Sequence, residues 1–172
     1  MLYLHGKIIE DQGIPAISPE YGEYEYHKIL KKLEGYGFVV ISEQRYKNTD
    51  GIEYANRVVE QINTLLEAGI PAKNITVVGA SKGAWITVYV SHLLANPEVN
   101  YVIMAICNPD NLETFRQDEI HLVGNVLSIY DSSDELAGSC QELFSHSEGK
   151  GLSKYEEVVR NIGTGHGILY QA

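Results

Sequence analysis

The sequence has 172 residues, of which 44% are hydrophobic and 21% are charged. A chain of this length buries about 70% of its unfolded surface, so we expect a single domain, residues 1–172, with one real core. The formal charge of −10, from 13 basic and 23 acidic side chains, argues against a partner that is a nucleic acid or a membrane surface. No apolar run approaches the roughly 18 residues that a membrane-spanning helix needs.

Cysteine usage bears on the compartment and on metal binding. Cys107 and Cys140 are the two cysteines of the chain, too few for a disulfide scaffold. We therefore expect a reduced, cytoplasmic protein, although a mature chain whose signal peptide had been removed would look the same. No HExxH motif or paired Cys/His spacing typical of a metal site occurs, so we expect no metal and no cofactor.

The predicted elements alternate between strand and helix from the start of the chain. Leu2 to Leu4 is a short apolar run that ends in His5-Gly6, and a loop with turn residues follows it. Over residues 23–35 the apolar side chains recur at helical spacing, and glycines end the pattern. Residues 38–41 form an uncharged apolar run rich in β-branched side chains, which indicates a strand buried on both faces.

The same alternation continues towards the C-terminal end. Helical spacing over residues 52–66 predicts a second long helix, which Gly69 ends. Strands are then predicted at 75–78, 101–106 and 125–130, with a helix at 84–95 between the first two, and a weaker strand is predicted at 157–162. Strands separated by such helices form parallel crossovers, so we expect an α/β fold: one doubly wound, mostly parallel sheet of about six strands with helices on both faces. In such sheets the functional site lies outside the carboxyl ends of the strands.

A Gly-x-Ser-x-Gly motif follows the strand at 75–78. Gly79, Ser81 and Gly83 stand between this strand and the next helix, which is the strand-turn-helix context of a nucleophile elbow. The serine of such an elbow occupies a strained turn, and glycines two residues to either side avoid a collision between strand and helix. The alternative is a turn of small residues in which Ser81 only caps the helix, since serine is a favoured N-cap.

One histidine lies in a loop of small residues near the end of the chain. His166 stands within Gly163-Thr164-Gly165-His166-Gly167, after the last predicted strand, and such a loop can bring its ring over the serine. A phosphate-binding glycine loop is not indicated, because it needs a helix after it and only five residues follow Gly167.

Two aspartates stand at the carboxyl end of the strand at 125–130. Either Asp131 or Asp134 could orient the histidine, and the order nucleophile, acid, histidine is the one that this kind of elbow requires. The alternative assigns both to turn chemistry, with Asp131 opening a turn and Asp134 capping a helix. A calcium loop is not indicated, because Leu136 stands where that loop needs glycine.

Together these motifs resemble the α/β-hydrolase family, in which a strand ending in His-Gly, a Gly-x-Ser-x-Gly elbow, an acid and a late Gly-His occur in this order. The resemblance covers nearly the whole chain. It implies that Ser81 is the nucleophile, His166 the general base and acid, and Asp134 the orienting carboxylate, ahead of Asp131 and of Asp110.

The resemblance also implies an oxyanion hole made by the backbone N–H groups of Lys7 and Lys82. Full-length members have two further strands before the His-Gly strand, which this chain lacks, and many have a lid where this chain has only residues 108–123. We therefore expect a small, lidless serine hydrolase that cleaves a carboxylic ester or thioester of a small substrate through an acyl-enzyme on Ser81. The alternative is a catalytically silent scaffold of this fold that binds a small molecule or a protein partner.

Basic side chains fall in the loops at the carboxyl ends of several strands. Lys7, Arg45, Lys47 and Lys82 would ring the mouth of the site, and such a rim would favour an anionic ester substrate. The cation at Lys82 is the most informative of the four, because the start of a helix disfavours positive charge. The alternative is a set of solvated side chains in weak surface ion pairs.

The family's strand order also bears on assembly. With its first two strands absent, the segment 37–42 becomes an apolar edge without charge. Uncovered edges of this kind invite pairing with another chain. We expect either homodimerisation through this edge or cover from the loop at 48–51.

Overall fold

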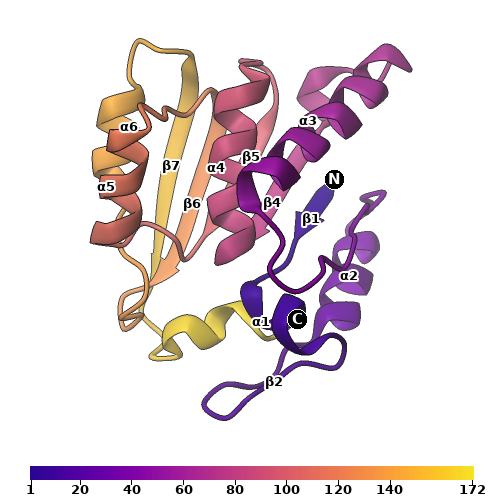
Figure 1. Ribbon diagram of the computed structural model, residues 1–172, viewed down its shortest axis with the longest axis vertical. Helices are drawn as coiled ribbons and strands as arrows, with labels where there is room; N and C mark the ends of the chain where they lie inside the picture. Colours follow the sequence, from indigo (N-terminus) through magenta and orange to yellow (C-terminus); the bar gives the residue numbers. More distant parts are fainter.

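The computed structural model describes residues 1–172 and is built around one parallel sheet of five strands (Figure 1). The strand order is β1–β4–β5–β6–β7, and every neighbouring pair is parallel. These strands are β1 (Leu2–Leu4), β4 (Thr76–Ala80), β5 (Asn100–Met104), β6 (Gly124–Asp131) and β7 (Leu152–Arg160). A small antiparallel hairpin, β2 (Ile17–Ser18) and β3 (Gly22–Glu23), lies outside this sheet.

The helices divide between the two faces of the sheet. They are α1 (Lys7–Gln12), α2 (Tyr26–Gly35), α3 (Gly51–Glu67), α4 (Lys82–Leu94), α5 (Pro109–Gln117) and α6 (Gln141–Ser147), with the short 3-10 helices η1 (Ala72–Asn74) and η2 (Gly165–Leu169). Helices α3 to α6 contribute to the larger of two core clusters, while α1, α2 and η2 contribute to the smaller one. None of the helices is both long and apolar enough to cross a membrane. The expected α/β fold with helices on both faces is confirmed.

The alternation of side chains along the strands explains the two cores. In β1, Leu2 and Leu4 belong to the larger cluster and Tyr3 to the smaller one. In β4, Val77 belongs to the larger cluster and Val78 to the smaller one. Successive side chains of a strand point to opposite faces, so a strand covered on both sides needs apolar residues at every position. This is why these segments appear in the sequence as continuous apolar runs.

The expected buried strand at 38–41 is wrong. The segment is joined to β1 by a single bridge between Leu2 and Ile41, so the sheet has five strands rather than about six. Val39 is 81% exposed, whereas Val40 packs against the smaller core. An apolar run predicts an extended segment, but it does not show whether other elements cover both of its faces. Here the segment lies at the edge of the sheet, and the loop at 48–51 leaves Val39 uncovered.

Three short helices were not predicted from the sequence. Helices α1, α5 and α6 have 6, 9 and 7 residues, and so few residues show too little of the 3.6-residue period to stand out. The first of them matters most for the site, because α1 begins directly after His5-Gly6, where a loop was expected.

Cys107 and Cys140 form a disulfide, contrary to the expected reduced thiols. Cys107 follows β5 and Cys140 precedes α6, and the fold brings their Cα atoms to 5.2 Å although 33 residues separate them in the sequence. Two isolated cysteines carry no sign of such proximity in their spacing, because it arises from the pairing of β5 with β6. The bond ties the loop after β5 to the loop after β6.

The apolar edge at 37–42 leads to a prediction about assembly. We expect a homodimer in which two such edges pair, because Phe38 and Val39 present apolar surface, 43% and 81% exposed, next to Val40, whose backbone groups make no hydrogen bond to another backbone group. Light scattering after size exclusion should give a dimeric mass for the wild type and a monomeric mass for Val39→Lys. The matched change Val159→Lys, on the opposite edge strand β7, should leave the dimer intact. A monomeric wild type would contradict the prediction.

Candidate active site

Ser81 stands at the sharp turn between β4 and α4. Its backbone has φ 53° and ψ −118°, a conformation that side chains other than glycine rarely adopt. Its N–H donates to the carbonyl of Met104 at 2.9 Å, and its carbonyl accepts from the N–H groups of Ala84 and Trp85 at 2.8 and 3.0 Å. The Ser81 side chain makes no capping hydrogen bond to the helix, so a role as a helix cap does not account for it.

Two glycines make this turn sterically possible. A Cβ atom on Gly79 would lie 2.3 Å from the carbonyl oxygen of Gly83. A Cβ atom on Gly83 would lie 1.9 Å from the carbonyl oxygen of Leu4. Helix α4 therefore crosses the ends of β4 and β1 at a separation that only glycine allows, which is the collision that the motif predicts.

His166 and Asp134 lie in line with Ser81. The Nε2 atom of His166 is 3.0 Å from Ser81 Oγ, and its Nδ1 atom is 2.8 Å from Asp134 Oδ2. The two side chains are almost fully buried, with 10% of His166 and 1% of Asp134 exposed. They come from η2 and from the turn after β6, so three separate turns meet at the carboxyl ends of the strands. The structure thus brings these three side chains into one hydrogen-bonded line.

Asp131 is also buried, but its carboxylate does not touch His166. Its Oδ1 atom accepts hydrogen bonds from the backbone N–H and hydroxyl of Ser133 at 2.9 and 2.6 Å, and Oδ2 accepts from the N–H of Ile162 at 3.2 Å. The bonds from Ser133, together with that from Ile162, hold the pKa of the Asp131 carboxyl at about 2. Asp131 therefore ties the turn that carries Asp134 to the loop that leads to His166.

The residues expected to form the oxyanion hole both begin helices. Lys7 is the first residue of α1 and Lys82 the first residue of α4. The first N–H groups of a helix have no partner inside it, so both backbone amides can donate to another acceptor. Gly6, which precedes Lys7, lies beside the elbow, since a Cβ atom there would be 3.7 Å from Ser81 Cβ. Helix formation after Gly6 fixes a segment that was expected to be a loop.

A small cavity of about 270 Å³ opens beside Ser81 and His166. Lys7 and Lys82 line it together with apolar side chains, which include Trp85, Ile106 and Leu136. A larger hollow of about 730 Å³ shares Leu136 in its wall and is lined by Glu20, Tyr21 and the small residues around His166. This larger hollow includes neither Ser81 nor His166 in its lining, so the smaller cavity is the one that adjoins the candidate catalytic side chains.

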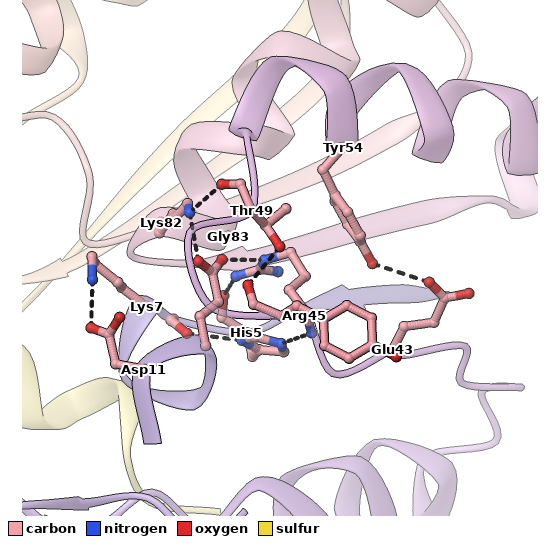
Figure 2. Close-up of polar contacts among 12 residues, drawn as sticks. His5, Lys7, Asp11, Glu43, Arg45, Thr49, Tyr54, Lys82 and Gly83 are labelled. Carbon is pink, nitrogen blue, oxygen red and sulfur yellow. Dashed lines mark hydrogen bonds and ion pairs between the residues drawn. The ribbon is translucent and has the colours of Figure 1, made fainter. Parts of the chain in front are cut away.

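Arg45 does not lie on the rim of the site, where the sequence predicted it. Its side chain is fully buried, with Nε donating to Glu10 Oε1 at 2.6 Å and Nη2 donating to the carbonyl of His5. Lys82 Nζ donates to Glu10 Oε2 at 2.6 Å and to the carbonyl of Thr49 at 2.7 Å (Figure 2). The physical reason is Glu10, which the unpredicted helix α1 places between the two cations. A pattern of charges along the sequence does not reveal such a buried partner.

The two other expected rim residues are exposed. Lys7 Nζ pairs with Asp11 at 2.5 Å on the surface, with 60% of the Lys7 side chain exposed (Figure 2). Lys47 is exposed and does not line the cavity. The expected preference for an anionic ester stays a prediction, with only Lys7 and Lys82 left at the cavity.

His5 braces the segment between β1 and α1. Its Nδ1–H donates to the carbonyl of Gly6 at 2.8 Å, because a carbonyl can only accept, and Nε2 then accepts the N–H of Arg45 at 2.9 Å. A ring with one accepting nitrogen is neutral. Burial, followed by the nearby Arg45 charge, lowers the pKa of His5 to about 4.

Comparisons with known proteins place the fold. No profile of a known protein family matches the sequence, and no curated protein does. The structure of SOBER1 from Arabidopsis thaliana is similar with a TM-score of 0.58 and 11% identity, over 95% of this chain and 90% of that one. A phospholipase/carboxylesterase from Dyadobacter fermentans is similar with a TM-score of 0.58 and 16% identity, over 94% of this chain and 79% of that one. A lipase-esterase related protein from Clostridium acetobutylicum is similar with a TM-score of 0.52 and 18% identity, over 98% of this chain and 87% of that one. The chain has the α/β-hydrolase fold, as the motifs predicted.

The lowered pKa of His5 predicts that acid reduces stability. In the unfolded chain the ring takes up a proton as the pH falls below 6.5, whereas in the folded protein it stays neutral down to about 4. The free energy of unfolding should therefore decrease between these values, and His5 should have no effect above them. Urea denaturation at about pH 7.5 and about pH 5 should show a smaller decrease for His5→Gln than for the wild type. The exposed His27→Gln should keep the wild-type decrease, and an equal decrease in both variants would contradict the assignment.

Proposed function

We propose that the protein is a serine hydrolase that cleaves a small carboxylic ester or thioester through an acyl-enzyme on Ser81. The observation that carries this proposal is the line of hydrogen bonds from Ser81 Oγ through His166 to Asp134. A serine hydroxyl alone is a weak nucleophile near neutral pH, and a histidine within hydrogen-bond reach removes its proton as the new bond forms. Asp134 holds the proton of His166 on Nδ1, so that Nε2 faces the serine as an acceptor.

The proposed cycle has two halves that use the same groups. In the first, Ser81 Oγ attacks the carbonyl carbon, His166 Nε2 takes the hydroxyl proton, and this proton then passes to the departing alcohol or thiol. In the second, His166 takes a proton from a water molecule that attacks the acyl-enzyme, and Ser81 leaves with that proton. The negative oxygen formed in both halves would accept hydrogen bonds from the backbone N–H groups of Lys7 and Lys82, each worth roughly 3 kcal/mol in related enzymes.

The strained backbone of Ser81 favours an enzyme over a silent scaffold. A non-glycine residue in a sparsely populated conformation costs on the order of 1–3 kcal/mol, and such strain is retained where it serves function. A scaffold that only binds a partner gains nothing from a serine held in this way. Two solved structures of this fold are described as a phospholipase/carboxylesterase and a lipase-esterase related protein, which also favours ester hydrolysis.

The size of the cavity favours a short acyl group. Its volume of about 270 Å³ lies just below the roughly 300–1,000 Å³ of pockets that enclose drug-sized ligands. Trp85, Ile106 and Leu136 supply apolar wall for the acyl chain. The segment 108–123, where many members have a lid, is largely occupied by the nine-residue helix α5. A long lipid chain would therefore remain partly in water.

The disulfide bears on the compartment. Disulfides persist in oxidising environments and are rare in the cytosol, where thiols are kept reduced. The bond between Cys107 and Cys140 therefore favours a location outside the cytoplasm over the cytoplasmic one that composition suggested.

The first test is whether Ser81 is nucleophilic. A fluorophosphonate probe should label the wild type but not Ser81→Ala, and p-nitrophenyl esters of short acids should be cleaved faster than those of long acids. His166→Ala should lower turnover about as much as Ser81→Ala, because the line of residues acts as a unit. Wild-type protein that stays unlabelled and cleaves none of these esters would favour the silent scaffold.

The second test separates Asp134 from its neighbour. Asp134→Asn should leave the fold intact and lower kcat by up to about 10⁴-fold, as in serine proteases, because the wrong tautomer of the histidine forms. Asp131→Asn, the same change on a carboxylate that does not touch His166, should lower the melting temperature more and kcat less. Full turnover in the first variant together with loss in the second would reverse the assignment.

A further inference from the structure

A buried group of charged side chains next to the elbow takes no part in the proposed cycle. The Glu10 carboxylate on α1 is 1% exposed and lies between the Arg45 guanidinium, which is fully buried, and the Lys82 ammonium, which is 22% exposed. Both ion pairs have N–O separations of 2.6 Å. Figure 2 shows the side chains of Lys82 and Arg45 near each other, close to Gly83 of α4.

Stability alone does not account for this group. Removing charges from water costs several kcal/mol per ion, and well-packed apolar side chains of similar volume often give equal or greater stability. The group is also not fully satisfied, because Arg45 Nη1 is buried without a hydrogen-bond partner. In addition, Lys82 places a cation at the start of α4, where the helix dipole disfavours it. What these charges supply is a pair of directional ion pairs that connect α1 to α4 and to the segment around Arg45.

The link joins the two segments that carry the proposed oxyanion donors. Glu10 stands three residues after Lys7 in α1, and its Oε2 atom is bonded to the side chain of Lys82, the first residue of α4. Its Oε1 atom is bonded to Arg45, which in turn donates to the carbonyl of His5, directly before α1. The Glu10 carboxylate therefore holds α1 next to the elbow, because each of its two oxygen atoms is bonded to a different cation.

We propose that Glu10 is a positioning residue that fixes α1 relative to α4, so that the backbone N–H groups of Lys7 and Lys82 converge on one oxygen atom. This inference rests on the hydrolase function proposed above. Oxyanion donors must lie about 2.7–3.1 Å from the developing negative oxygen. A displacement of about 1 Å at a catalytic group can cost about 10²-fold in rate, so a small shift of α1 is sufficient to impair the chemistry.

The test is a double-mutant cycle of Glu10→Gln and Lys82→Met, each assayed with a short p-nitrophenyl ester and with the fluorophosphonate probe. Each single change should lower kcat and the labelling rate by about 10²-fold and leave KM within about twofold, because the oxyanion exists only in the transition state. Both changes break the same link, so the double variant should be no slower than the more impaired single variant.

Glu43→Gln is the matched control. Glu43 lies in the same region (Figure 2) and accepts hydrogen bonds from Tyr54, Arg57 and Gln61 of α3, but it forms no hydrogen bond or ion pair with α1 or α4. This variant should keep the wild-type kcat. Thermal melting, monitored by circular dichroism, shows whether each variant is folded at the assay temperature. If Glu10→Gln does not fold, Lys82→Met decides, because it leaves the buried pair of Glu10 and Arg45 intact.

The outcomes separate this inference from the proposed function. Wild-type kcat in folded Glu10→Gln or Lys82→Met, or a double variant in which the two losses multiply, would overturn the positioning role while leaving the hydrolase function intact. A rise in KM with unchanged kcat would likewise overturn it, because that pattern marks ground-state binding. An unlabelled, inactive wild type would overturn the hydrolase function and the positioning role together.

Discussion

The arrangement of the site depends on how closely α4 crosses the end of β1. At Gly83 the helix backbone passes so near to the carbonyl of Leu4 that any side chain would collide with it. This contact brings the segment after β1 next to the turn after β4, where Ser81 has a strained conformation and makes no side-chain hydrogen bond to the helix. The proximity of the proposed nucleophile and the proposed oxyanion donors therefore follows from one close approach of the backbone.

Other links hold the remaining loops at the same edge of the sheet. Parallel strands end at a common edge, so the turns after β4 and β6 and the loop after β7 meet there without long insertions. Asp131 joins the turn after β6 to the loop before His166 through its bonds to Ser133 and Ile162. The bond between Cys107 and Cys140 adds a covalent tie to the loop after β5. The hydrogen bonds of 2.8 and 3.0 Å that join Asp134, His166 and Ser81 require these side chains to be positioned to a fraction of an ångström. Short loops that are tied to one another provide this precision.

The parts of the structure that could be predicted from the sequence are those with a local physical cause. The strands have apolar side chains at every position because both faces are covered, and Gly79 and Gly83 mark a steric requirement a few residues away. Features that depend on distant contacts could not be predicted. The burial of Arg45 needs Glu10, and the disulfide needs the register of β5 with β6. The prediction of a buried strand at 38–41 was wrong for the same reason, because an apolar run does not indicate which elements lie beside it.

The pairing of Lys82 with Glu10 also has a consequence for the proposed catalysis. A free ammonium next to Ser81 would attract carboxylates and phosphates in the ground state, and such binding competes with a neutral ester without lowering the barrier. Glu10 and the carbonyl of Thr49 both accept hydrogen bonds from this ammonium, which holds it in place, although Glu10 is shared with the second cation, Arg45. The groups proposed to face the reacting oxygen are instead the backbone N–H groups of Lys7 and Lys82, which bind a neutral carbonyl weakly and a negative oxygen strongly. In the proposed mechanism, holding the Lys82 ammonium on Glu10 and Thr49 thus limits ground-state binding of anions and leaves the developing negative oxygen to the backbone N–H groups.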